Sequence, residues 1–480
     1  MLFGTNGVRG LFDELDPLLA LKIAKGIGLY FKSGKIGVAR DARLTGECLE
    51  HAIVSGLMST GCKVINFGII SSPTAEFMIK KLKLDGLIII TASHNPPEWN
   101  AIKVVDGKGV AISRERGEEI EKLMDSTKKV EWNKIGKEGK YSKAIEDHIE
   151  AIVKEINIPK IKKRKPKLVL DPGNGAAGTI VSELFRRIGC EVIEINSKLD
   201  GNFPNRNSEP TKENVKGLIE QVKKEKADAG IAWDGDGDRV IFVDGTGEYI
   251  IGDKVFGIST NIRLKEKLGE IVTTVATSRM IEDIGKKFGV KTTYTKVGAP
   301  YLSEEMAKGR AVIGGEEVGG VIWPEFSLAK EGMLTAAKMV EALCEKKLSE
   351  MVGELPKYYL KKIKIEVKDE AEKKKALEKV KKYAEKEKLE HITIDGVRIN
   401  YPNQSDRKSV TSCQERRIVP EHDRERVPFS TPQIAKQQFV DGWVIIRASG
   451  TEPVIRIFAE GKTEKEAEEL LEKIKKIATN

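Results

Sequence analysis

Long hydrophobic runs are missing from this chain of 480 residues. No apolar stretch approaches the roughly 18 residues that a membrane span needs, so we expect no membrane association. The first five residues carry neither a basic nor an apolar segment, and a signal peptide is therefore not expected. Cysteine is also scarce, and no two cysteines form a CxxC pair, which favours reduced thiols in a cytoplasmic protein without a zinc knuckle. The five cysteines are Cys48, Cys62, Cys190, Cys344 and Cys413.

A strong excess of one charge is absent too. The chain has 82 Lys and Arg against 73 Asp and Glu, a formal net charge of +9. This weak bias argues against a dedicated nucleic-acid-binding protein, which concentrates basic residues on one face. A charged fraction of 32% and a hydrophobic fraction of 40% are typical of a soluble globular chain. The length allows two to four domains.

The first three quarters of the chain alternate short apolar runs with helical patterns. Continuous apolar runs of this length are typical of parallel strands covered on both faces. The repeated strand–helix order predicts about three doubly wound α/β blocks, with the Lys-rich residues 158–166 as a seam between the first two. The strand candidates are residues 35–39, 63–67, 87–90, 167–170, 191–195, 270–275 and 311–313.

The last quarter predicts a smaller α+β domain. A charged helix is expected over residues 371–389 and strands over 443–446 and 454–458. An amphipathic helix should follow over residues 463–477, with Thr463 as its N-cap and acidic residues in its first turn.

Residues 403–438 do not fit this pattern. They hold five glutamines, whereas the rest of the chain has one, Gln221, and they prefer Arg where their surroundings prefer Lys. Scarce Gln with abundant Lys and Glu is a thermophile-like composition, which this segment lacks. We interpret it foremost as a long polar surface loop, with a functional lid or a partner-binding loop as the alternative.

The first chemical motif is Thr91-Ala92-Ser93-His94-Asn95-Pro96, directly after the strand candidate 87–90. Catalytic groups in parallel α/β folds lie at the carboxyl ends of strands, where this motif places Ser93. There is no G-x-S-x-G elbow, and adjacent Ser and His side chains do not normally pair, so a serine hydrolase is excluded. Taken alone, the motif is equally compatible with a structural turn.

The second motif is Asp234-Gly235-Asp236-Gly237-Asp238-Arg239. In an extended loop, a period of two would place the three carboxylates on one side, where all-oxygen ligands select a hard cation such as Mg²⁺. An EF-hand is excluded, because its sixth position would be Arg239 and its twelfth Gly245. Arg239 beside a metal implies a second anion, most simply a phosphoryl group.

The third motif, residues 447–453, offers a guanidinium, two hydroxyls and backbone N–H groups around Gly450, the inventory of a phosphate cradle, although a hairpin turn would also explain it. A fourth, residues 173–178, is a formal G-x-G-x-x-G with Glu194 at the end of the next strand. It supports a rival class, a nicotinamide-dependent dehydrogenase, but a lone match is weak evidence and leaves the three aspartates unexplained.

Together with GTNGVRG at residues 4–10 and GGEEVGG at 314–320, these motifs occur in an order that resembles the α-D-phosphohexomutases, archaeal-like members in particular. That family includes phosphoglucomutase, phosphomannomutase and phosphoglucosamine mutase. The resemblance covers the whole chain except residues 403–438, where the family has only a few residues, so this segment is interpreted as an insertion, a neutral loop or a sequence artefact. It implies three related α/β domains with mixed, largely parallel sheets and a smaller C-terminal α+β domain around a central cleft. The expected domains are residues 1–150, 151–252, 253–365 and 366–480.

The resemblance also implies a role for individual residues. Ser93 would be the phosphoserine and would complete a Mg²⁺ site with the three aspartates. Arg9 and Arg239 would stabilise the transferring phosphoryl group, and Lys103 would act as general base or acid. Glu316 would bind sugar hydroxyls. The phosphate that is not transferred would be gripped by Arg447, Ser449, Gly450 and Thr451.

The implied reaction interconverts hexose 6-phosphate and hexose 1-phosphate through a hexose 1,6-bisphosphate, in a cytoplasmic monomer or homodimer. The Gly-Thr-x-Gly-x-Arg-Gly opening resembles phosphoglucosamine mutases most, which puts glucosamine phosphate first and mannose or glucose phosphate second. Val318 stands where the family commonly has Ser or Asn. A catalytically silent sugar-phosphate-binding protein is the remaining alternative.

Overall fold

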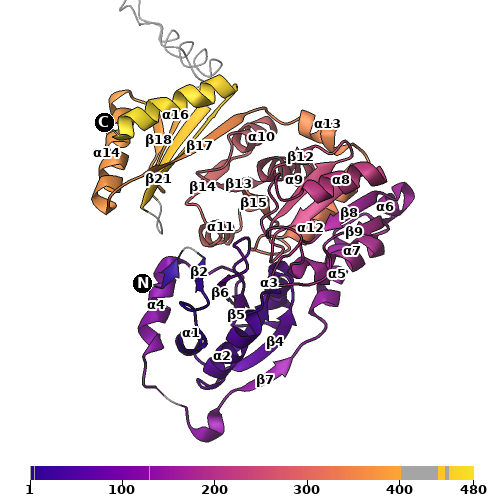
Figure 1. Ribbon diagram of the computed structural model, residues 1–480, viewed down its shortest axis with the longest axis vertical. Coiled ribbons are helices and arrows are strands. Elements are labelled where there is room, and N and C mark those ends of the chain that lie inside the picture. The colour runs from indigo at the N-terminus through magenta and orange to yellow at the C-terminus, as the bar shows by residue number, and fades with distance from the viewer. Residues whose placement is uncertain (1, 5, 129, 402–441, 449–452, 480) are drawn as a thin grey trace, which may run out of the picture. The chain divides into compact units, whose positions relative to one another are not determined.

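The computed structural model describes residues 2–4, 6–128, 130–401, 442–448 and 453–479. The chain forms two compact units (Figure 1). The first comprises residues 1–277 and 281–355, and the second comprises residues 278–280 and 356–480. Within the described residues, no helix combines the length and apolar content that crossing a bilayer requires.

The first sheet has seven strands in the order β1-β2-β6-β5-β3-β4-β7. Strands β5, β3, β4 and β7 run parallel, and β6 and β2 are antiparallel to their neighbours. The strands are β1 (Phe3–Gly4), β2 (Gly7–Leu11), β3 (Lys35–Arg40), β4 (Lys63–Ile69), β5 (Gly86–Ile90), β6 (Trp99–Asp106) and β7 (Lys137–Lys140). The helices of this region are α1 (Pro17–Tyr30), α2 (Gly46–Met58), α3 (Ser72–Leu82), α4 (Arg114–Met124), η1 (Trp132–Lys134), α5 (Ala144–Lys154) and α6 (Ile158–Arg164).

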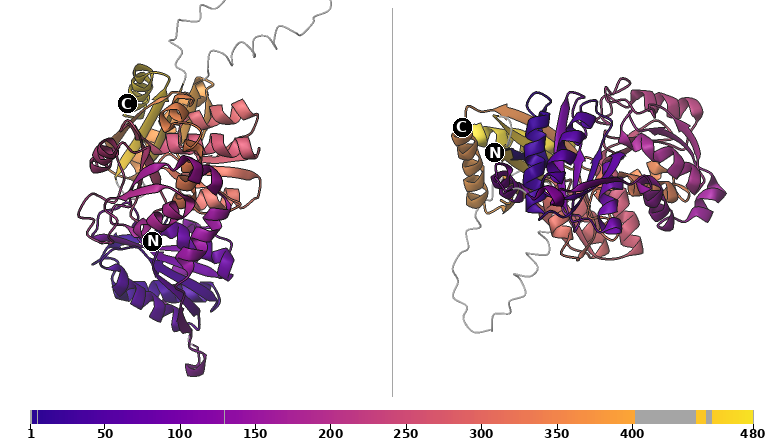
Figure 2. Two further views of the ribbon diagram at one scale, coloured as in Figure 1. Left: turned by 90° about the vertical axis from the view of Figure 1, so that its right-hand side faces the viewer. Right: turned by 90° about the horizontal axis from the view of Figure 1, so that it is seen from below.

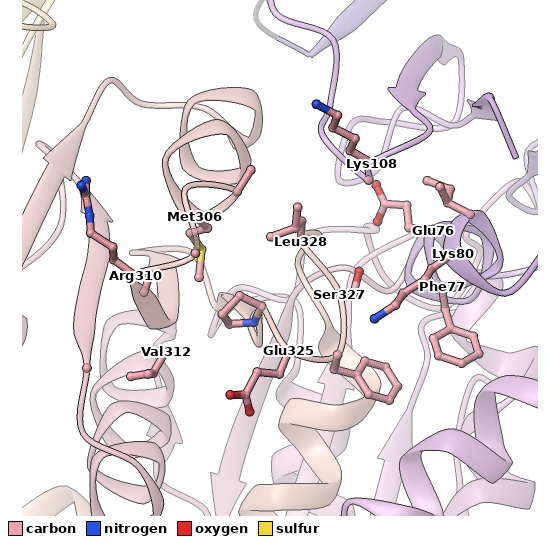
Figure 3. Close-up of a pocket in the computed structure, with 18 of the residues that line it drawn as sticks. Glu76, Phe77, Lys80, Lys108, Met306, Arg310, Val312, Glu325, Ser327 and Leu328 are labelled. Atoms are coloured by element: carbon pink, nitrogen blue, oxygen red, sulfur yellow. The ribbon is translucent and has the colours of Figure 1, made fainter. Parts of the chain in front are cut away.

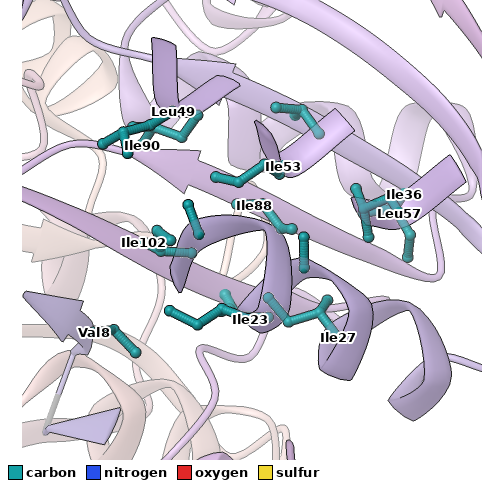
Figure 4. Packing of buried hydrophobic residues seen from close by; sticks show 14 of the residues in the cluster. Val8, Ile23, Ile27, Ile36, Leu49, Ile53, Leu57, Ile88, Ile90 and Ile102 are labelled. Atoms are coloured by element: carbon teal, nitrogen blue, oxygen red, sulfur yellow. The ribbon is translucent and has the colours of Figure 1, made fainter. Parts of the chain in front are cut away.

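Both faces of this sheet are covered, as its continuous apolar strands predict. Alternate side chains of β5 point to opposite faces, so that Ile88 and Ile90 pack with α1 and α2, whereas Leu87 and Ile89 pack with α3. Figure 4 shows the first of these clusters, and Figure 2 shows helices on both sides of the strands. Burying β5 on both faces leaves its carboxyl end as the place where polar side chains can gather.

The second sheet has the order β12-β11-β10-β8-β9, with β8, β9 and β10 parallel and β11 antiparallel to β10. The third has the order β14-β13-β15-β16, with only β16 antiparallel. Their strands are β8 (Lys167–Asp171), β9 (Glu191–Glu194), β10 (Ala229–Trp233), β11 (Val240–Asp244), β12 (Tyr249–Ile250), β13 (Glu270–Thr274), β14 (Thr292–Thr295), β15 (Ala311–Glu316) and β16 (Gly320–Ile322). Their helices are η2 (Ala176–Thr179), α7 (Val181–Ile188), α8 (Lys216–Glu225), α9 (Gly252–Glu266), α10 (Met280–Phe288), α11 (Ala299–Met306), α12 (Gly332–Leu343) and α13 (Leu348–Gly353).

The second unit contains an antiparallel sheet of five strands in the order β17-β21-β20-β19-β18, with α14 and α16 packed against it. The capping prediction for the last helix is confirmed, since Thr463 Oγ1 accepts from Glu466 N at 3.2 Å. The elements are β17 (Tyr359–Glu366), α14 (Glu370–Lys386), β18 (Glu390–Ile392), β19 (Val397–Tyr401), β20 (Gly442–Ala448), β21 (Val454–Gly461) and α16 (Glu464–Thr479). The predicted fold class, three α/β regions and a C-terminal α+β region, is confirmed.

The Lys-rich residues 158–166, predicted as a seam, are mostly helix α6, which Asn157 caps by accepting from Lys160 N and which buries Ile161. One local prediction is corrected. The strand predicted to end at residue 313 continues to Glu316, because Gly314 and Gly315 lack the side chains that would collide with Met306 and Phe256. The domain boundaries stay a prediction, and the one at residue 150 falls inside α5. The predicted insertion, residues 403–438, lies outside the described residues.

Candidate active site

Ser93 lies in a tight turn at the carboxyl end of β5, within a segment that we call the Ser93 loop, residues 91–97. Its φ of 52° places it in the left-handed region, which a non-glycine residue adopts at a cost of about 1–3 kcal/mol. Thr91 Oγ1 accepts the Ser93 N–H at 2.9 Å and so holds this turn. Ser93 is 3% exposed.

Arg43 fixes the Ser93 loop from behind. Its guanidinium is buried, pairs with Asp41 at 3.0 Å and lies over the ring of Phe203, 5.1 Å from its centroid. It donates to four backbone carbonyls, those of Ser93, Asn95, Pro96 and Trp99. The sequence analysis did not find Arg43, although the charged run Arg40-Asp41-Ala42-Arg43 at the end of β3 was a signal for it.

The three aspartates follow β10 in a segment that we call the aspartate loop, residues 234–239. The prediction of an extended loop is wrong, because Gly237 adopts a φ of 79° and Asp234 Oδ1 accepts from Gly237 N at 3.1 Å, which closes a tight turn. The turn still brings the carboxylates together, with one oxygen of each within 4.8 Å of the others. Asp234, Asp236 and Asp238 are also buried rather than on the surface.

Polar and cationic side chains from other elements contact each aspartate. Ser93 Oγ donates to Asp234 Oδ2 at 2.6 Å, and this contact joins the Ser93 loop to the aspartate loop. Lys103 Nζ lies 2.6 Å from Asp236 Oδ2 and Lys330 Nζ 2.9 Å from Asp238 Oδ2. The two ammonium groups therefore compensate much of the charge that would otherwise drive the carboxylates apart.

The protonation of the aspartates reflects this crowding. Burial, with the neighbouring charges of Asp236 and Asp238, raises the pKa of Asp234 to about 8. Burial also raises the pKa of Asp236, but the contact with Lys103 outweighs it and leaves that pKa well below its usual range. A carboxyl that burial and neighbouring carboxylates favour in its protonated form can exchange that proton for a bound cation.

The donor set fits a hard cation. Among the described residues, Asp236 Oδ1 and Asp238 Oδ1 are buried without a hydrogen-bond partner, so oxygen ligands face the cluster unused. Carboxylate and hydroxyl oxygens are the ligands that Mg²⁺ prefers.

Two arginines approach the same place. Arg9 donates through Nη1 to Asn95 Oδ1 at 2.5 Å, in the Ser93 loop. Arg239 Nε is 3.9 Å from Asp238 Oδ1, too far for a hydrogen bond. Burial lowers the pKa of Arg9, and the positive charge of Arg239 lowers it further. Two cationic groups that converge in this way favour an anion such as a phosphoryl group.

His94 does not act as a base for Ser93. Its Nδ1 lies 3.5 Å from Ser93 Oγ, at the limit of a hydrogen bond, while the same Oγ donates to Asp234 at 2.6 Å. Burial, then the positive charges of Arg239 and Arg9, lower the pKa of His94 to about 2, so the imidazole is neutral near pH 7. The exclusion of a serine hydrolase is consistent with this geometry.

Glu316 ends β15, directly before the turn that leads to β16. Its carboxylate is buried and Oε1 lies 3.0 Å from Lys330 Nζ. Burial raises the pKa of Glu316, but Lys330 and Arg239 lower it below its usual range. Lys330 thus joins Glu316 to Asp238 through one ammonium group.

The predicted phosphate cradle belongs to the second unit. Arg447 lies near the end of β20, where its guanidinium pairs with Asp395 at 2.7 Å. The other three residues of that prediction, Ser449, Gly450 and Thr451, lie outside the described residues.

Family models match the chain from one end to the other. The matches are to phosphoglucomutase/phosphomannomutase domains I, II and III and to the C-terminal domain of the same family, over residues 1–131, 146–247, 251–359 and 363–477. The chain belongs to the phosphoglucomutase/phosphomannomutase family.

Relatives agree along their whole length. A phosphoglucomutase/phosphomannomutase from Thermococcus kodakarensis is 41% identical over 98% of this chain and 97% of its own. A phosphoglucosamine/phosphogalactosamine mutase from Sulfurisphaera tokodaii is 35% identical over 99% and 98%. The solved structure of a phosphoglucomutase/phosphomannomutase family protein from Burkholderia thailandensis superimposes with a TM-score of 0.82 at 25% identity, covering 99% of this chain and 96% of the other. The chain is therefore a phosphohexomutase family enzyme, an intramolecular phosphotransferase.

Membership of this family excludes the dehydrogenase alternative, and the structure explains the misleading motif. The space beside Gly173 is filled by the guanidinium of Arg206, 2.4 Å from where a Cβ would stand. Gly175 packs against Gly235 O in the same way, at 2.6 Å. In this phosphohexomutase family member the glycines therefore make room for Arg206 and the aspartate loop, and not for a dinucleotide.

Proposed function

We propose that this enzyme interconverts hexose 6-phosphate and hexose 1-phosphate through a phosphorylated Ser93 and a hexose 1,6-bisphosphate. The observation that carries the proposal is the 2.6 Å hydrogen bond between Ser93 Oγ and Asp234 Oδ2, which delivers a strained serine to a buried carboxylate cluster. Phosphoryl transfer requires mainly positioning and charge neutralisation, and both are supplied at this point.

The reaction has two symmetrical halves. In the first, the bond between Ser93 Oγ and phosphorus breaks and Ser93 Oγ gains a proton, while the free hydroxyl of the hexose phosphate loses its proton and bonds to phosphorus. In the second, the bisphosphate has turned around, Ser93 Oγ loses its proton and takes back the other phosphoryl group, and the product hydroxyl regains a proton. Lys103 is placed to exchange that proton, since its Nζ is buried beside the cluster.

Cationic side chains stabilise the negative charge on the transferring phosphoryl group. We assign this role to Arg9 and Arg239, because their guanidinium groups converge on the Ser93 loop and the aspartate loop. Ser93, Asp234, Asp236 and Asp238 would hold Mg²⁺, which when bound supplies Lewis-acid stabilisation of phosphoryl oxygens. A hexose 1,6-bisphosphate would serve as activator as well as intermediate.

Substrate binding is assigned to two further groups of residues. Glu316 would accept hydrogen bonds from sugar hydroxyls. The phosphate that is not transferred would be held by Arg447, Ser449, Gly450 and Thr451, which combine a cation with hydroxyl and backbone N–H donors.

Among hexoses we put glucosamine phosphate first. The opening Gly4–Gly10 resembles phosphoglucosamine mutases. Mannose or glucose phosphate is the second candidate, favoured by the 41% identity to a relative named phosphoglucomutase/phosphomannomutase.

Two measurements test the proposal. Coupled assays with glucosamine, mannose and glucose 6-phosphates, each with Mg²⁺ and a trace of the matching 1,6-bisphosphate, should give one clearly preferred substrate, expected to be glucosamine 6-phosphate. Peptide mapping should locate an added mass of about 80 Da on Ser93. No turnover of any of the three sugars would leave the silent-binder alternative instead. Light scattering at assay concentration distinguishes the proposed monomer from the homodimer.

A further inference from the structure

A chain of four buried polar side chains runs behind the aspartate loop. Ser71 Oγ lies 2.7 Å from Thr74 Oγ1, which lies 2.9 Å from His148 Nδ1. His148 Nε2 lies 3.3 Å from Glu331 Oε2. The four residues come from the start of α3, from α5 and from the start of α12, and all four are 0% exposed. Polar groups buried this deeply are retained only where they are paired.

The contacts along this chain differ in kind. Glu331 Oε1 accepts from the backbone N–H groups of Met333 and Leu334, so this carboxylate caps α12. Its other oxygen, Oε2, lies 3.3 Å from His148 Nε2, and each of these two buried atoms has no hydrogen-bond partner in the described residues. At the other end, hydrogen bonds join Ser71 to Thr74 and Thr74 to His148 Nδ1. His148 therefore links the start of α3 to the cap of α12 by one hydrogen bond and one ion-pair contact.

Aromatic rings enclose the histidine. The ring of Phe77 stacks on His148 with centroids 5.1 Å apart, and that of Phe326 lies 5.7 Å away. The same two phenylalanines line a cavity of about 500 Å³. Figure 3 shows this cavity, with Phe77, Glu76 and Leu328 among the labelled residues that line it. The rings separate the polar chain from that cavity, and the enclosed hydrogen bonds are stronger for the lack of competing water.

Each end of the chain is adjacent in sequence to a residue that contacts the aspartate loop. Next to Ser71, Ser72 donates through Oγ to Asp236 Oδ2 at 2.6 Å and through its backbone N–H to Asp236 O at 2.9 Å. Next to Glu331, Lys330 contacts Asp238 at 2.9 Å. The polar chain therefore joins the support of one aspartate to the support of another.

We infer that His148 is a positioning residue, which sets the separation of Ser72 and Lys330 and thereby holds Asp236 and Asp238 in the spacing that a cation requires. This inference rests on the proposed function, in which the aspartate loop binds Mg²⁺. Mg²⁺ demands near-ideal octahedral geometry and tolerates displaced ligands poorly. Residues that orient ligands from behind typically change metal affinity about 10–100-fold when they are replaced.

The test measures Mg²⁺ binding by calorimetry on the purified, dephosphorylated full-length protein, with MgCl₂ alone as titrant. His148→Phe keeps the ring stack and removes both polar contacts, and should weaken Mg²⁺ binding about 10–100-fold. His148→Gln retains an amide donor that can reach Glu331, and should recover part of the loss. Ile152→Ala, a buried apolar site on the same helix, is the matched control and should lower the melting temperature without changing the Mg²⁺ affinity.

The outcomes separate the two levels of the argument. If the wild type binds Mg²⁺ and His148→Phe binds it within about twofold, the positioning role is wrong and the proposed function stands. If the wild type does not bind Mg²⁺, the metal assignment fails and this inference with it. Should His148→Phe not fold, Thr74→Val breaks the same chain with a side chain of equal shape, and an unchanged Mg²⁺ affinity there overturns the inference equally.

Discussion

The Ser93 loop and the aspartate loop both follow a fully buried five-residue strand, yet they are held in opposite ways. The Ser93 loop is held by its backbone, since Arg43 binds three of its carbonyls and that of Trp99 just beyond it, while the Ser93 hydroxyl contacts Asp234. The aspartate loop is held largely by its side chains, through Ser72, Lys103 and Lys330. A group that must gain and lose a phosphoryl needs a fixed backbone that does not use its hydroxyl for support. A metal-binding group needs its carboxylates placed and their charge compensated until the cation arrives.

Replacing Ser93 should break the first loop's function most severely. Ser93→Ala removes the oxygen that accepts and donates the phosphoryl group, so turnover should fall by several orders of magnitude. The coupled assay measures this loss, and the melting temperature should change little because the left-handed backbone is held by Arg43. Ser55→Ala, which removes an exposed hydroxyl on α2, is the control. Near-normal turnover in Ser93→Ala would sink the mechanism.

Replacing an aspartate should break the second loop's function next. Asp236→Asn keeps the shape but removes a charge, so Mg²⁺ affinity should fall by more than the roughly 10–100-fold typical of an indirect contact. Titrating activity and heat release with MgCl₂ measures the change. Lys103 would lose its 2.6 Å partner and keep Asp238 at 3.9 Å, so a modest loss of stability is also expected. Unchanged Mg²⁺ activation would mean that the carboxylates are not the site.

Arg43 tests whether the Ser93 loop is held by its backbone. Arg43→Lys retains the charge beside Asp41 but cannot contact four carbonyls, so the loop should shift and kcat should fall by roughly 100-fold. The KM for the hexose phosphate should stay nearly constant, because no substrate-binding group changes. Arg398→Lys, at a buried arginine over Trp443 in the second unit, controls for the stability cost alone. Full turnover per folded molecule in Arg43→Lys would show that the Ser93 loop keeps its conformation without the contacts of Arg43.

The smallest expected effect lies on α3, behind the aspartate loop. Burial, with the negative charges of Asp238 and Asp236 and against the positive charge of Lys103, raises the pKa of Glu76 to about 8. Because the folded protein binds this proton more tightly than the unfolded chain, stability should fall as pH rises from about 4.5 to about 8. The fall is measured as the difference between the urea unfolding midpoints at pH 5 and pH 8. Glu76→Gln should make this difference smaller, whereas Glu119→Gln, at an exposed position, should leave it unchanged. Mg²⁺ should also reduce it in the wild type, and an equal slope with and without Mg²⁺ would contradict the coupling.

Much of the fold and part of the site could be predicted from local patterns. Ser93 and the three aspartates stand directly after apolar strands, and a short window of sequence shows both the strand and the polar cluster. The predicted shape of the aspartate loop was wrong, because a period of two assumes an extended backbone and Gly237 turns the chain back. The sequence pattern predicted Glu316 after its strand and not within it. The reason is that Gly314 and Gly315 have low strand propensity, and the sequence does not show the packing that favours them here.

The supporting residues could not be predicted in the same way. Ser72 contacts Asp236 across 164 positions, and His148 contacts Thr74 across 74. No window holds both partners, and a lone buried histidine or serine has no distinctive neighbours. Arg43 was nearer to discovery, since it ends a charged run beside the strand that neighbours β5. Contacts of this kind follow from the order of the strands in each sheet. The sequence pattern predicts the fold class but not that strand order.

The three residues 278–280, which group with the second unit, have a consequence for how that unit is made. Arg279 donates its N–H to Glu460 at 2.9 Å and its guanidinium to Tyr401 O at 3.0 Å, 181 and 122 positions later. During synthesis this short piece leaves the ribosome long before its partners exist. A protein truncated to begin at Pro356 would never contain it, and Glu460 would be buried without the donor that Arg279 supplies. The C-terminal unit is therefore assembled last and cannot be complete when cut from the chain at one point.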